Sequence, residues 1–143
     1  MAQEVLTTPP TQSSVEAPET LTQAVHRLAV TYQQPEALIK RLIKCEAQKY
    51  TYQKTKTSEP LEVDGTTYYI DLNGTHKNIN TEGEWWSTDY GPLMVNDYYH
   101  EAEMRRMGLS ITKWQNSLEF GIRVMLKNEG TQPWSASKAC WSK

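Results

Sequence analysis

The sequence lacks the features that mark several classes of protein. No apolar run approaches the roughly 18 residues that a membrane-spanning helix needs, which excludes insertion into a membrane. The formal net charge of −2 gives no reason to expect nucleic-acid binding through bulk electrostatics. The 143 residues suit one ordinary domain, long enough to bury a single core, and we expect a monomer.

A secretion signal is also missing. Residues 1–18 have neither the basic start nor the apolar middle of a signal peptide, although a chain that begins at its mature end would lack both. They are rich in Thr, Ser and Pro and show no periodicity, so we interpret them as a flexible tail or linker. The folded domain is expected to comprise residues 19–143.

Cysteine is scarce, with only Cys45 and Cys140 in the chain. If they pair, the bridge closes a loop of 95 residues and stabilises the fold by roughly 4–5 kcal/mol, whereas free buried thiols are the alternative. A thiol enzyme that uses Cys45 is a further alternative, which a bridge would rule out. The two cysteines and three scattered histidines lack metal-ligand spacing, so the sequence implies no metal and no organic cofactor.

Two helices are predicted near the start of the domain. Thr20 can cap a helix that runs to about Tyr32, and Pro35 suits the first position of a second helix that reaches about residue 50. In the second helix Leu38, Leu42 and Glu46 follow one another at intervals of four, so Glu46 ends an apolar stripe.

Glu46 needs an explanation because carboxylates usually lie on the solvent face of a helix. Its side chain could simply reach solvent past the last turn. It could instead be held in partly apolar surroundings, which would keep its proton bound to a higher pH, as a general acid requires.

Strand and turn signals follow the second helix. Asp64-Gly65 between strand-forming residues is a strong hairpin signal, and Asn73-Gly74 and Glu82-Gly83 mark further turns, so we predict one antiparallel sheet of two or three strands. Helices are predicted again over residues 97–107 and 111–130, followed by a loop over 131–143. The predicted fold class is α+β, mainly helical, with the small sheet forming one wall of a cleft.

The segment "WWSTDYGPLMVND", residues 85–97, contains a second notable carboxylate, Asp89, in polar surroundings. Glycosidic bond cleavage uses two carboxyl groups, one that stays protonated and one that stays ionised. Different surroundings allow one protein to supply both at the same pH, and Glu46 and Asp89 have that contrast.

Residues around Asp89 are suited to binding sugars. Aromatic rings can stack on sugar faces and amides can bond to hydroxyl or acetamido groups, although aromatic residues near a sheet are more commonly part of the core. These candidate binding residues are Asn80, Trp86, Tyr90, Asn96, Tyr98, Tyr99 and His100.

Three segments, in order, resemble parts of the lysozyme-like superfamily. "STDYGPLMVNDYYH" resembles the sheet segment of animal-type lysozymes, and "LIKRLIKCEAQKY" resembles the helix that carries the catalytic Glu in lytic transglycosylases. "NSLEFGIRVMLKNEGTQPWSASKACW" is similar to the C-terminal part of small bacterial transglycosylase-like proteins. The resemblance covers residues 34–142.

The resemblance implies a lysozyme-like fold with Glu46 as the general acid and Asp89 as nucleophile or stabiliser. It further implies that Asn96 bonds to an N-acetyl group, that Tyr98, Tyr99 or His100 line the cleft, and that Cys45 and Cys140 are bridged. Related proteins act outside the cell, in the periplasm or at the cell wall.

The chain departs from the pattern at two positions beside the site. Ala47 stands where a Ser commonly follows the catalytic Glu, and Met94 stands where the strand usually has Gln. The expected function is cleavage of the β-1,4 bond between N-acetylmuramic acid and N-acetylglucosamine in peptidoglycan or a related N-acetylglucosamine polymer. Hydrolysis and lytic transglycosylation both remain open, and a non-catalytic glycan-binding module is the alternative.

Overall fold

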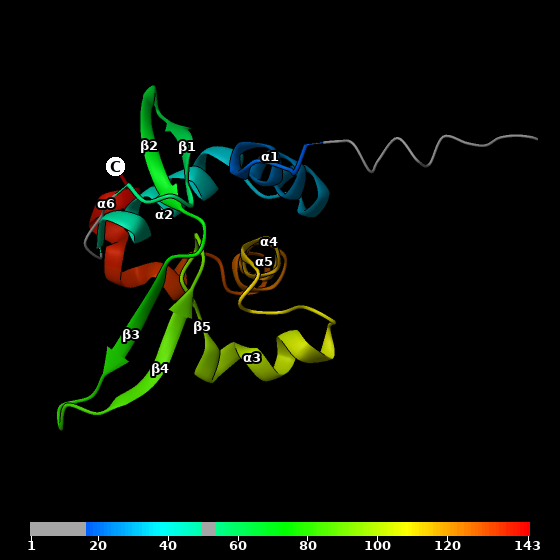
Figure 1. Ribbon diagram of the computed structural model, residues 1–143. Coiled ribbons are helices and arrows are strands. Elements are labelled where there is room, and N and C mark those ends of the chain that lie inside the picture. Colours follow the sequence, from blue (N-terminus) through cyan, green and yellow to red (C-terminus); the bar gives the residue numbers. More distant parts are fainter. Residues whose placement is uncertain (1–16, 50–53) are drawn as a thin grey trace, which may run out of the picture.

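The computed structural model describes residues 17–49 and 54–143, and it confirms a mixed α+β protein (Figure 1). Within these residues the helices come first and last, and the strands lie between them. The predicted tail falls outside the described residues as far as residue 16. In the described part of the chain, no helix has the length and apolar character needed to cross a membrane.

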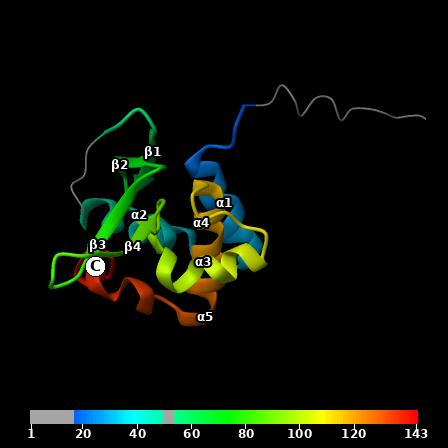
Figure 2. The same ribbon diagram turned by 60° about the horizontal axis from the view of Figure 1, so that its bottom comes forward.

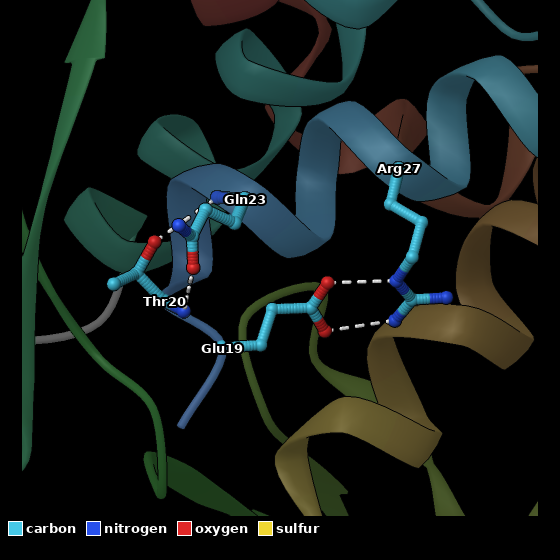
Figure 3. Close-up of polar contacts among 4 residues, drawn as sticks. All are labelled: Glu19, Thr20, Gln23 and Arg27. Carbon is cyan, nitrogen blue, oxygen red and sulfur yellow. Dashed lines mark hydrogen bonds and ion pairs between the residues drawn. The ribbon is translucent and has the colours of Figure 1, made fainter. Parts of the chain in front are cut away.

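Helix α1, Leu21–Tyr32, begins where the sequence predicts. The Thr20 hydroxyl accepts a hydrogen bond from the Gln23 backbone N–H, and the Gln23 side chain accepts one from the Thr20 N–H, so the cap satisfies two otherwise unpaired donors (Figure 3). Beside the cap, both carboxylate oxygens of Glu19 accept hydrogen bonds from the Arg27 guanidinium (Figure 3). This pair fixes the residues that lead into the helix.

Helix α2, Glu36–Lys49, follows directly after Pro35, and its apolar stripe faces the core. The predicted last residue, Tyr50, lies outside the described residues. Ile39, Leu42 and Ile43 are fully buried. The helix packs against α1, against the first hairpin and against the C-terminal helical segment.

The strands form two separate antiparallel sheets, not the single sheet that the sequence predicts. Strands β1, Ser58–Val63, and β2, Thr66–Asp71, pair through the expected turn at Asp64-Gly65, where both residues have positive φ. Residues 72–74 then turn the chain away. The next strands therefore pair only with one another, and the two hairpins extend from the body in opposite directions (Figure 1).

The second sheet contains β3, Thr75–Ile79, β4, Trp85–Tyr90, and the short β5, Val95–Asn96. Helix α3, Asp97–Arg106, starts immediately after β5 and ends before Gly108, as predicted. The Asp97 carboxylate accepts a hydrogen bond from the Thr88 N–H of β4. This bond holds the first turn of α3 against the sheet.

The predicted helix over 111–130 is shorter and is interrupted by a π-helical stretch. It consists of α4, Trp114–Phe120, the π-helix η3, Gly121–Leu126, and the short α5, Lys127–Glu129. Gly121 stands where η3 passes the loop between β4 and β5. A Cβ atom at this position would lie 2.7 Å from the Leu93 Cδ1 atom, so the glycine permits close packing of the loop on the helix. Despite the π-helical stretch, α4 and α5 follow one another along one line (Figure 2).

The C-terminal segment is helical, which corrects the prediction of a loop over 131–143. It forms the 3₁₀ helix η4, Gln132–Ser137, and helix α6, Lys138–Trp141. Both tryptophans are buried, and the Trp134 indole N–H donates to the Leu93 carbonyl while that of Trp141 donates to the Trp134 carbonyl. Partners for both indole groups make this burial favourable and define the path of the segment.

The buried apolar residues form one core, to which the N-terminal helices, the first hairpin and the C-terminal helices contribute. Leu93 joins it from the loop between β4 and β5, and Val95 joins it from β5, whereas the outer part of the β3–β4 hairpin projects away from it (Figure 1). The largest fully buried side chains are Leu21, Leu28, Ile39, Leu42, Ile43, Leu61, Ile70, Leu93, Met104, Phe120, Leu118 and Ile122.

Candidate functional site

A pocket of about 430 Å³ lies where the second sheet meets the helices, and we call it the Glu46 pocket. It takes its walls from α2, the second sheet, α3 and the C-terminal helices. Five of the residues that the sequence predicts for the site line it, namely Glu46, Asp89, Asn96, Tyr99 and His100. Its other lining residues are Lys49, Met94, Met125, Glu129, Pro133 and Trp134.

Glu46 lies in the last turn of α2, and its side chain is buried. Only 4% of the residue is exposed, which excludes the alternative that it simply reaches solvent. Burial raises the pKa of the Glu46 carboxyl, because removal from water disfavours the charged form. A hydrogen bond from Ser137 and the charge of Lys49 lower this pKa in part, and the charge of Asp89 raises it.

The C-terminal segment is tied to α2 around Glu46. Cys45 and Cys140 form a disulfide, as the resemblance implies, and this bridge rules out a thiol enzyme that uses Cys45. The Ser137 hydroxyl donates to the Glu46 carboxylate over 2.8 Å, and the Arg41 side chain donates to the Trp141 carbonyl over 3.2 Å. Segments almost a hundred residues apart in sequence thus enclose one carboxyl group.

Asp89 lies on β4, lines the Glu46 pocket and is 8% exposed. Its Oδ1 atom accepts hydrogen bonds from the side-chain amides of Asn78, at 3.2 Å, and Asn96, at 2.8 Å. The same two amides also donate to the Ser87 hydroxyl. Asp89 therefore sits in polar surroundings, in contrast to Glu46.

Asn96 lines the pocket, but its side chain is engaged within the protein. Its Oδ1 atom accepts a hydrogen bond from the Tyr99 N–H and caps α3, while its Nδ2 group donates to Ser87 and Asp89. The sequence could not distinguish this structural role from contact with an acetamido group.

Three of the predicted binding residues form an exposed aromatic cluster: Trp86, Tyr98 and Tyr99. The rings meet edge to face, with centroids 5.1–6.2 Å apart. Their exposed fractions are 42%, 69% and 66%, so they are not core residues. Because Tyr99 also lines the Glu46 pocket, the aromatic cluster and the pocket form a continuous surface.

His100 is half-buried between the pocket and the core, where its ring contacts Phe120 at a centroid distance of 5.2 Å. Burial lowers the pKa of this imidazole, and the negative charges of Glu129 and Glu103 oppose that effect. The neutral ring is thereby favoured at neutral pH.

Four of the predicted binding residues do not line the Glu46 pocket. Trp86 and Tyr98 belong to the adjoining aromatic cluster, and the other two are Asn80 and Tyr90. Asn80 lies in the turn between β3 and β4, where its side-chain oxygen accepts hydrogen bonds from the backbone N–H groups of Glu82 and Glu84. Tyr90 lines a separate hollow of about 170 Å³ beside Gly74.

The pocket also uses residues that the sequence analysis missed. Asn78 could have been found, because the hairpin pairing places it opposite Ser87 on the neighbouring strand. Ser137 carries no local signal, since it lies 91 positions from Glu46 and meets it only in the folded chain. Glu129 and Lys49 are ordinary charged residues at helix ends and do not stand out in the sequence.

The structure shows an α+β protein in which a buried glutamate and an aspartate that accepts hydrogen bonds from two amides line the same pocket. Across residues 17–49 and 54–143, no group of three or more His, Cys, Asp or Glu side chains could hold a metal ion. Comparison of the chain with protein families, with curated proteins and with solved structures finds no match.

Proposed function

We propose that the protein is a peptidoglycan glycosidase with Glu46 as its general acid. One observation carries the proposal: the Glu46 carboxyl is buried, its pKa is raised by that burial, and it nevertheless lines an open pocket. A carboxyl group in this situation keeps its proton to a higher pH than a solvated one. It can therefore protonate the glycosidic oxygen between N-acetylmuramic acid and N-acetylglucosamine.

Asp89 is suited to the complementary role. It lines the same pocket, and two amide groups donate hydrogen bonds to its Oδ1 atom. A negative charge there would stabilise the oxocarbenium character that develops as the glycosidic bond breaks, or trap it as a glycosyl-enzyme. The reaction uses two carboxyl groups in different surroundings, and here Glu46 is buried whereas Asp89 is surrounded by polar side chains.

Two products are consistent with this site. If Asp89 acts on the sugar, water completes the reaction and a reducing end results. If Glu46 works alone, it protonates the leaving oxygen and then removes the proton from a hydroxyl of the substrate itself, which gives an anhydro sugar. The disulfide is typical of extracytoplasmic proteins, which is consistent with action in the periplasm or at the cell wall.

A non-catalytic glycan-binding module is the second candidate. The exposed aromatic cluster favours it, because Trp86, Tyr98 and Tyr99 could stack on sugar rings without any chemistry in the pocket. If the protein is such a module, Trp86→Ala should weaken saccharide binding, and the wild-type protein should not cleave the saccharide.

Mass spectrometry of the soluble products from purified peptidoglycan tests both candidates. Wild-type protein is compared with Glu46→Gln, which removes the acidic proton and keeps the shape of the side chain. Glu62→Gln is the matched control, since Glu62 lies exposed on β1 outside the pocket. We expect Glu46→Gln to fold normally and to lose nearly all turnover, and the control to retain it.

The products decide between the mechanisms. Reducing-end muropeptides would establish hydrolysis, and anhydromuramic products would establish transglycosylation. Turnover by Glu46→Gln at the wild-type rate would contradict the proposed acid. If wild-type protein releases neither product, the same assay is repeated with chitin oligomers, and a second negative result favours the binding module.

A further inference from the structure

The Ser137 hydroxyl lies within hydrogen-bonding distance of two oxygen atoms that differ in chemistry. Its Oγ atom is 2.8 Å from Glu46 Oε2 and 3.1 Å from the Trp134 carbonyl oxygen. A hydroxyl group has a single proton to donate and two lone pairs that can accept. Ser137 can therefore donate fully to only one of these oxygens at a time.

This arrangement matches both protonation states of Glu46. When Glu46 is ionised, the Ser137 proton points to the carboxylate. When Glu46 carries its proton, the Glu46 O–H group donates to Ser137 Oγ, and the Ser137 proton turns to the Trp134 carbonyl. Every polar group keeps a partner in both states, and the change requires only rotation of one hydroxyl proton.

We propose that Ser137 is a positioning residue that holds the Glu46 carboxyl in one orientation in both of its protonation states. The inference rests on the proposed function, in which Glu46 must give up a proton and regain it. Ala47, the residue directly after Glu46 in the chain, has no hydroxyl to offer. Here the hydroxyl comes from the C-terminal segment, 91 positions away.

The surroundings keep Ser137 in place. The Trp134 carbonyl, its second partner, also accepts the Trp141 indole N–H, and the Trp134 side chain is buried and bonded to the Leu93 carbonyl. The disulfide at Cys140 lies three residues after Ser137 and joins the segment to α2. Ser137 is consequently held from both sides.

Other charged groups also act on Glu46 and must stay unchanged in a test. Lys49 on α2 lowers its pKa, and Asp89 on β4 raises it. His100 on α3 and Glu129 on α5 line the same pocket. None of these is altered by a substitution at Ser137, so a change in the Glu46 titration can be assigned to the hydroxyl.

The test is a titration of the Glu46 carboxyl carbon by ¹³C NMR, with the resonance assigned from Glu46→Gln. Ser137→Ala should raise the pKa of Glu46, because the ionised form loses a donor. Ser135→Ala is the matched control, since Ser135 is exposed on the same helix and outside the pocket, and it should leave this pKa at the wild-type value. Ser137→Thr keeps the hydroxyl and Ser137→Val replaces it with a methyl group, and the two side chains have nearly the same shape. Comparison of these two variants therefore gives the same test if the alanine variant fails to fold.

Kinetics on peptidoglycan supply the second readout. We expect Ser137→Ala to lower kcat roughly tenfold with little change in KM, and to move the basic limb of the pH profile upward, because the acid is less well oriented and holds its proton longer. In Ser137→Thr, which keeps the hydroxyl, both kcat and the basic limb of the pH profile should lie close to the wild-type values. An unchanged Glu46 pKa in Ser137→Ala and Ser137→Val would overturn the inference whether or not the protein is an enzyme. A shifted pKa in a protein without turnover would instead support the hydrogen bond and refute the proposed function.

Discussion

Removal of the Cys45–Cys140 bridge is expected to destabilise the folded protein by about 4–5 kcal/mol. The two cysteines are 95 positions apart, and the chain-entropy model gives about 4.7 kcal/mol at 25 °C for closing a loop of this length in the unfolded chain. Their Cα atoms are 5.9 Å apart, which is ordinary spacing for a bridged pair. The bridge should therefore deliver most of that stabilisation.

Urea unfolding of wild type and of a Cys45→Ala, Cys140→Ala double variant measures this difference. Whole-protein mass before unfolding establishes that the wild-type thiols are oxidised. Converted to a melting temperature for a chain of this length, the loss corresponds to a fall on the order of 15 °C. Reduced wild type should unfold at the same urea concentration as the double variant, and reductant should not change the unfolding of the double variant.

A difference of less than about 1 kcal/mol between oxidised and reduced wild type would refute the loop-closure reasoning. It would mean that α2 and the C-terminal segment stay close together in the unfolded chain even without the bridge, so that the bridge removes little entropy from it.

Three further substitutions test the packing, the electrostatics and the surface. Gly121→Ala should lower the unfolding free energy by about 1–3 kcal/mol in urea titrations, because its Cβ atom would overlap the fully buried Leu93 side chain. Burial raises the pKa of Glu46, so the folded state binds this proton more tightly than the unfolded chain, and stability falls as pH rises from the ordinary value of 4.5 through the raised pKa. The stability of Glu46→Gln relative to wild type should therefore increase between pH 4 and pH 8, and a constant difference would contradict the assigned burial effect. Trp86→Ala should weaken binding of peptidoglycan fragments in calorimetry while changing stability by less than about 1 kcal/mol, because the ring is exposed; loss of the fold would show that it is structural.

Local chemistry made much of the fold predictable. The Thr20 cap, the Pro35 start and the Asp64-Gly65 turn each act within a few residues, and the structure has all three where the sequence indicates them. The single predicted sheet was wrong because strand pairing depends on which strands meet in space. The predicted C-terminal loop was wrong because its helical turns depend on burial of Trp134 and Trp141 against distant backbone carbonyls.

The candidate site was predictable to a similar extent. The apolar stripe of α2 predicted an unusual environment for Glu46, and its burial confirms that environment. Pattern could not show that Asn96 is occupied as a helix cap or that Asn80 lies in a turn away from the pocket. In the sequence, either asparagine looks the same as one whose side-chain amide binds a sugar.

The sequence by itself determined where the helices begin, where the hairpins turn and which carboxylate ends an apolar stripe, because these depend on neighbours within one or two turns. Only the tertiary structure decided that Ser137 meets Glu46 and that Glu46 and Asp89 line one pocket. It also decided that the disulfide joins α2 to the C-terminal segment, whose Pro133 and Trp134 line the pocket. Those contacts join parts of the chain that become neighbours only when a single core is buried, and no local pattern encodes such a meeting.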